Sequence, residues 1–218
     1  MKFAVPALLA ALCFGCVGRP KEAYVEWSPQ SSEAGKTEAL TLIIESKTDD
    51  IPQWVQVYER LGVRGVEELP LYQGAYLFIS GNSGGNFGAL TQWLAGFTVS
   101  HDFAPLVAAR VQARFTEESV TFPDQDFGVF FEDAVKGAFD GTYTGAVRDS
   151  DFWVRRRYFE EDGVTVDRDV YEFFILVTID KAALRSQLDA LLGAIPLRGS
   201  KEQVANITRV RTAFYDTF

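Results

Sequence analysis

Two side chains in this 218-residue chain could do chemistry in the setting that their neighbours provide. One belongs to a cysteine that follows a small residue, and the other to the single histidine. Cys16 follows Gly15, and a small residue before the cut is what a lipoprotein-type signal peptidase requires. His101 stands beside Asp102, a pairing that a general base and its orienting carboxylate would use. The first pattern predicts a covalent lipid anchor. The second predicts proton transfer only if a nucleophile or a positioned water lies nearby.

The residues before Cys16 are typical of a secretory leader. One positive charge precedes the segment from Phe3 to Phe14, which contains no charged side chain. An apolar run of about 12 residues is too short to cross a bilayer, which needs roughly 20. Cleavage before Cys13 fits less well, because Leu12 is a bulky residue for that position. An ordinary signal peptide and a buried N-terminal helix stay open as alternatives, although Pro6 disfavours the helix.

The leader predicts three regions: a lipoprotein signal peptide at 1–15, a flexible tether at 16–38 that begins with lipidated Cys16, and a single α+β domain at 39–218. Gly, Pro, Ser and charged residues with little periodicity favour the tether. Each buried methylene of an acyl chain contributes about 0.8 kcal/mol, so two or three chains anchor a protein stably. We therefore expect a lipid-anchored protein of the bacterial cell envelope, at the outer membrane and facing the periplasm.

The composition excludes several function classes. A formal net charge of −9 disfavours nucleic acid as a partner, because phosphate binding needs a basic surface. The negative charge also disfavours electrostatic docking on anionic lipids, so the acyl anchor alone is expected to hold the protein at the membrane. Both cysteines lie at or before the predicted cut, so the mature body has no disulfide and no Cys-ligated metal. With one histidine as well, we expect no metal and no cofactor.

Hydrophobic periodicity predicts an α+β fold: a small sheet of mixed or antiparallel strands with helices packed on one face. Pro105 is expected to kink the longest helix, and Gly62 to end the first. The segment from Tyr171 to Ile179 is almost wholly apolar and predicts a central strand covered on both faces. The expected strands are 40–45, 75–80, 147–159 and 170–179, and the expected helices are 52–61, 90–115 and segments after Asp126, Asp180 and Ser200.

Three consecutive arginines, Arg155, Arg156 and Arg157, lie on the predicted third strand. Strand alternation sends the first and third to one face and the second to the other, so cross-strand pairing with carboxylates is the first expectation. The same residues are a possible interaction surface. An exposed strand edge beside them would invite pairing with another chain.

Other patterns have simpler structural explanations. The glycine-containing segment 81–88 lacks the spacing of a phosphate-binding loop, so a strand-to-helix turn is favoured. His101 continues an apolar helical stripe, which favours a packed histidine. The acidic residues near the expected helix after Asp126 do not have the spacing of an EF-hand loop, so capping and solvation are favoured over calcium binding. These acidic residues are Asp124, Asp126, Glu132 and Asp133.

Several short motifs resemble the bacterial family of outer-membrane lipoproteins of about twenty kilodaltons (the Lpp-twenty type). Besides the lipoprotein cysteine, the similar features span about residues 45–195. The resemblance implies a compact α+β domain that faces the periplasm, with envelope or assembly roles and no catalytic residues. Pro105 and the helix after Ser200 depart from the pattern. The motifs are Pro52-Gln53-Trp54-Val55, Phe78-Ile79-Ser80-Gly81 before a long alanine-bearing helix, Asp151-Phe152-Trp153-Val154, and Thr178-Ile179-Asp180-Lys181.

These observations favour a non-enzymatic envelope lipoprotein that binds or assembles with other proteins. Its expected partners are the membrane, through the acyl anchor, and either an unidentified envelope protein or a second copy of the chain. Two alternatives stay open. The many aromatic residues could line the pocket of a small apolar-ligand carrier, and His101 could serve a hydrolase if a serine or a water-positioning carboxylate lay within reach.

Overall fold

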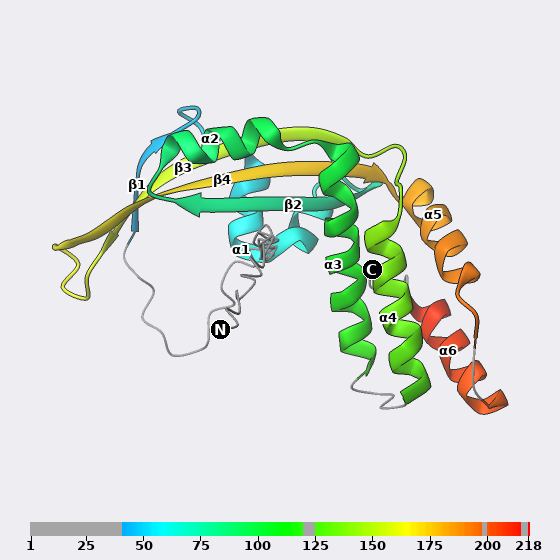
Figure 1. Ribbon diagram of the computed structural model, residues 1–218. Helices are drawn as coiled ribbons and strands as arrows, with labels where there is room; N and C mark the ends of the chain where they lie inside the picture. Colours follow the sequence, from blue (N-terminus) through cyan, green and yellow to red (C-terminus); the bar gives the residue numbers. More distant parts are fainter. Residues whose placement is uncertain (1–40, 120–124, 198–199, 215–217) are drawn as a thin grey trace, which may run out of the picture.

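The computed structural model describes residues 41–119, 125–197, 200–214 and 218 (Figure 1). The predicted signal peptide at 1–15, the lipidation of Cys16 and the tether at 16–38 lie outside the described residues.

Four strands form one antiparallel sheet, which confirms the predicted α+β class. The strand order is β1-β3-β4-β2, so β3 and β4 occupy the centre. A tight turn joins the two central strands, and its Gly163 has φ +67°, a conformation that favours glycine. The strands are β1 (Thr41–Ser46), β2 (Ala75–Gly84), β3 (Val147–Phe159) and β4 (Val166–Asp180).

Both faces of the sheet carry a hydrophobic core, because successive side chains of each strand point to opposite faces. On the first face, Phe174 and Leu176 of β4 pack with Phe152 of β3 against helix α1 (Gln53–Glu67). On the second face, Ile175 and Val177 of β4 belong to the core that the other helices cover. The prediction that β4 is covered on both faces is confirmed.

Among the described helices, five cover the second face and α1 covers the opposite face, so the prediction that the helices pack on one face is wrong for α1. Figure 1 shows α3 to α6 gathered at one end of the sheet, where the larger core lies, and the β3–β4 hairpin projecting at the other end. The five helices are α2 (Phe87–Gly96), α3 (Val99–Ser119), α4 (Gln125–Asp140), α5 (Lys181–Ala194) and α6 (Lys201–Ala213).

The long helix expected at 90–115 is broken at Phe97 and not at Pro105. Phe97 has an extended backbone, and α3 starts afresh at Val99. A side-chain cap explains the position of the break, because Oδ2 of Asp102 accepts a hydrogen bond from the Thr98 backbone N–H at 2.7 Å. Pro105 lies inside α3 near its start.

Two other boundaries differ from the prediction. Gly62 does interrupt α1, with φ +66°, but helical structure resumes and continues to Glu67. Strand β2 extends to Gly84 because it pairs with β4 as far as Tyr171. The segment from Gly81 to Gly84 is therefore strand, where a loop was expected.

Candidate functional site

The three consecutive arginines of β3 lie on two faces of the sheet, as alternation predicts. Arg156 lies opposite Val170 of β4, while Arg155 and Arg157 lie opposite Tyr171 and Asp169. Since directly opposite residues share a face, these pairs divide the arginines between the α1 face and the face that carries α2. The expected cross-strand pairing with carboxylates is confirmed on both faces.

Arg156 holds two carboxylates beside α1. Its Nε donates to Oε2 of Glu172 at 2.8 Å, and its Nη2 donates to Glu59 of α1. The hydroxyl of Tyr158 donates to the other oxygen of Glu172 at 2.8 Å. Burial and, next, the hydrogen bond to Glu172 raise the pKa of Tyr158 to about 12. Glu172 is only 6% exposed, so this network neutralises a charge inside the core.

On the opposite face, Arg155 and Arg157 share Asp169. The guanidinium of Arg157 donates to both carboxylate oxygens, at 2.9 and 3.1 Å, and Nη2 of Arg155 donates to Oδ2 at 2.8 Å. The hydrogen bond from Arg157 is the main cause that lowers the pKa of Asp169. The guanidinium carbon of Arg155 also lies 5.3 Å from the centre of the Tyr171 ring, a cation–π distance.

Aromatic side chains continue this face from the arginines to the start of α2. The ring centre of Phe87 lies 5.0 Å from that of Trp153 and 5.1 Å from that of Tyr171. Trp153 stacks on Phe173 at 6.0 Å. Phe87 is 40% exposed, and Trp153 and Tyr171 are partly exposed. We call the five residues Phe87, Trp153, Arg155, Arg157 and Tyr171 the arm face.

Sequence reasoning named the arginines of the arm face but missed its aromatic part. The signal for Trp153 and Tyr171 was present in the alternation of β3 and β4, since both have the same strand parity as Arg155. Phe87 carried no such signal, because it comes from another element and reaches this face through the turn after β2.

The prediction of an exposed strand edge beside the arginines is wrong for β3. Strand β1 pairs with β3 there, with Leu42 opposite Arg157 and Ile43 opposite Arg156, and β4 pairs on the other side. Sequence alone could not place β1, because its pairing joins segments more than 100 residues apart. Within the described residues, an unpaired side remains on β4 before Tyr171, the last β4 position that β2 reaches.

That unpaired stretch of β4 is irregular and charged. The register shifts between Tyr158 and Phe159, which leaves Asp167 as an extra residue on β4. Bulges and charged side chains are two devices that keep edge strands from pairing with other chains. The stretch consists of Val166, Asp167, Arg168, Asp169 and Val170.

His101 is exposed, so the prediction of a packed histidine is wrong. Its side chain is 87% exposed, and Nδ1 lies 2.9 Å from Oδ1 of Asp102. The apolar stripe on which the prediction rested is interrupted at Phe97, and α3 begins at Val99 in a new direction (Figure 1). Asp102 uses its other oxygen to cap α3 at Thr98. The pair therefore lies at a helix start on the surface.

The other candidate motifs resolve into local structure. Asn86 caps α2 by accepting a hydrogen bond from the Ala89 N–H at 3.1 Å, so the glycine-containing segment is a strand followed by a capped helix. Asp124 lies outside the described residues, and nothing is described of the Asp126 side chain. In the described part of the chain, no group of three or more His, Cys, Asp or Glu residues could hold a metal ion.

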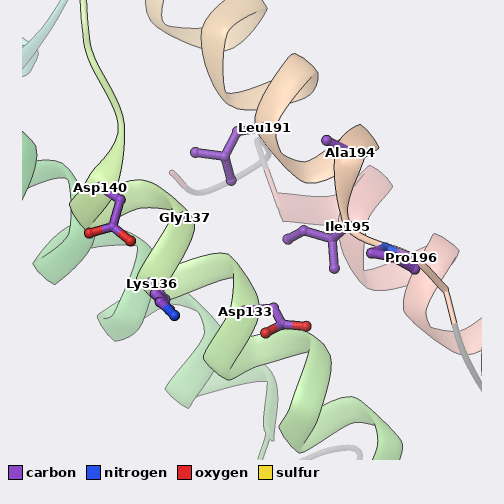
Figure 2. A pocket seen from close by; sticks show the side chains of 8 residues that line it. All are labelled: Asp133, Lys136, Gly137, Asp140, Leu191, Ala194, Ile195 and Pro196. Carbon is purple, nitrogen blue, oxygen red and sulfur yellow. The ribbon is translucent and has the colours of Figure 1, made fainter.

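Two surface grooves border helix α4. One, of about 380 Å³, lies between α4 and α5, with Leu191 and Ile195 pointing toward Gly137 of α4 (Figure 2). Gly137 permits this approach, since a Cβ there would lie 3.2 Å from Leu191. The other groove, of about 410 Å³, lies between α3 and α4 and is lined mainly by apolar atoms. The charged side chain of Lys136 borders both.

Comparisons with known proteins give no match. No family model matches the chain, and neither a curated protein nor a solved structure matches it. Among the helices of the described residues, none is both long enough and apolar enough to cross a membrane.

Proposed function

We propose that this protein is a lipid-anchored component of the bacterial cell envelope that acts by binding other proteins and has no catalytic activity of its own. The single observation that carries the proposal is the leader that ends at Gly15-Cys16. Acylation of Cys16 would hold the folded body at a membrane surface, where it meets other envelope proteins.

The arm face is the contact surface that we propose for such a partner. Tyr, Trp and Arg are the residues most enriched among those that dominate binding energy at protein interfaces. Here they lie together on the outer part of the sheet, with Phe87 at one border. This surface replaces the strand edge that the sequence suggested, since β1 covers that edge.

Site-specific photo-cross-linking in intact bacteria tests the contact. Leu42 is 54% exposed and lies opposite Arg157, so a photoreactive residue placed there probes the arm face without disturbing its members. Leu61 on α1 is 67% exposed and is the matched control. We expect a protein adduct from position 42 and not from position 61, and its loss when Cys16→Ser releases the protein from the membrane. No adduct from position 42, or equal adducts from both positions, would contradict the proposed contact.

The two alternative functions have less geometric support. A small-ligand carrier needs a closed apolar cavity, whereas the two grooves beside α4 are open to solvent. A hydrolase needs a positioned nucleophile near His101, whereas the carboxylate of the adjacent Asp102 caps a helix. If His101→Ala leaves the phenotype unchanged, the hydrolase alternative is excluded.

A further inference from the structure

Helix α4 carries a stripe of four exposed side chains spaced three, four and three residues apart: Val129, Glu132, Lys136 and Phe139. This spacing places them on one side of a helix, as along the seam of a coiled coil. Val129 is 42% and Phe139 is 58% exposed. Glu132 and Lys136 are exposed as well, and within the described part of the chain neither makes an ion pair. We call these four residues the α4 seam.

The α4 seam forms a ridge between two depressions. The α4–α5 groove lies on one side (Figure 2) and the α3–α4 groove on the other, and Lys136 borders both. The α3–α4 groove is lined by one α3 residue, Gln112, which carries no charge. Its other lining residues belong to α4 and include Glu132, Lys136 and Phe139 of the seam. A ridge beside grooves of similar size is the surface that a second helix packs against.

The order of side chains in the seam reads the same from both ends: apolar, charged, oppositely charged, apolar. A two-fold axis midway between Glu132 and Lys136 would align α4 antiparallel with α4 of a second copy. Glu132 would then lie opposite Lys136 of the second copy, and Val129 opposite Phe139. Because a two-fold interface repeats each contact, both pairs would form twice.

From this complementarity we propose that the protein forms a homodimer through antiparallel packing of the α4 seam on that of a second copy. The inference rests on neither the lipid anchor nor the arm face. It also accounts for two large apolar side chains at the surface, which the dimer would bury opposite each other.

The unpaired stretch of β4 is a poorer surface for self-association. Two-fold antiparallel pairing centred on Arg168 would place this residue opposite its own copy. The same pairing would place Asp167 opposite Asp169. Like charges directly opposite each other destabilise a strand pair, so the charges oppose self-pairing there and favour it on α4.

Charge reversal tests the dimer. Sedimentation velocity of the full chain in a mild detergent should show a concentration-dependent dimer. Glu132→Lys should weaken dimerisation at least about tenfold, because like charges then face each other twice, and Lys136→Glu should do the same. The double variant should dimerise again. An equimolar mixture of the two single variants should form a heterodimer, since each then supplies the charge that the other needs.

The controls separate dimerisation from folding and from detergent effects. Glu161→Lys makes the same charge change at the exposed hairpin turn and should leave the dimer intact. Glu132 and Lys136 are exposed and make no ion pair within the described fold, so the circular dichroism of all variants should be unchanged. A wild-type chain that stays monomeric, single variants that still dimerise, or a mixture that does not associate would each overturn the proposal.

Discussion

The two ends of the sheet differ in how their charged side chains are paired. At the hairpin end, Arg155, Arg156 and Arg157 of β3 are held by carboxylates from β4 and α1. At the helical end, the core is built from aromatic and aliphatic side chains, and the exposed charges Glu132 and Lys136 of α4 are left without ion-pair partners in the described chain. The arginine run is therefore already paired within the fold, whereas in the described chain the Glu132 and Lys136 charges of α4 are free to pair with another molecule.

The largest expected effect lies at the helical end. Phe115 is fully buried, and its ring contacts Phe130 and Phe214, so it joins α3 to α4 and to the residue that follows α6. Phe115→Ala should lower the free energy of unfolding by about 4 kcal/mol, because truncation leaves a cavity. Urea denaturation measures this. Leu71→Ala, at a side chain that is 81% exposed, is the control and should change it by less than about 1 kcal/mol.

The next effect separates the two faces of the hairpin end. Arg156→Ala leaves Glu172 charged and buried, and should cost about 3 kcal/mol in unfolding free energy. Arg157→Ala removes a more exposed guanidinium and should cost less than about 1 kcal/mol. Equal losses in parallel urea titrations would contradict the distinction. Replacing Arg156 and Glu172 together by Leu should recover most of the loss, because the most buried charge is then removed and Glu59, which also loses its partner, is more exposed.

A smaller effect depends on pH. Hydrogen bonds from Arg157, and then Arg155, hold the pKa of Asp169 below its ordinary value of 3.8. A lowered carboxyl pKa stabilises the fold fully above the ordinary value, and this stabilisation is lost as the pH falls through the folded-state pKa. The stability difference between wild type and Asp169→Asn should therefore be constant near neutral pH and shrink below pH 3.8. A difference that stays constant at low pH would show that the ion pairs contribute nothing.

The smallest expected effect concerns the hairpin turn. Gly163 has a positive φ of 67°, so Gly163→Ala should cost about 1 kcal/mol, measured by thermal unfolding. Gly84 is the control, because its φ is not positive and a Cβ there would meet no atom within 4 Å. An equal cost at both positions would mean that strain in the turn is not the cause.

Local patterns predicted much of the fold. The bounds of β3 agree with the prediction, and Asp180 caps α5 as expected by accepting a hydrogen bond from the Ala183 N–H at 2.9 Å. The signals were short-range: strand alternation, a turn glycine and a capping side chain. The break at Phe97 was missed because Pro105 is the more conspicuous helix breaker, whereas the cap at Thr98 decides where α3 begins.

The candidate site was predictable only in part. Alternation correctly divided the arginines between two faces, but their partners lie on other elements, and Glu172 stood within an almost wholly apolar run. The pairing of β1 with β3 depends on contacts between distant segments and had no local signal. Local sequence thus predicted the face to which each side chain points, whereas the pairing of distant segments determined which residues it contacts.

Mass spectrometry of the N-terminal peptide of the protein purified from bacterial membranes tests the proposed function most directly. The proposal predicts a peptide that begins at Cys16 and carries acyl groups. A soluble chain that still begins at Met1 and has an unmodified Cys16 would contradict it.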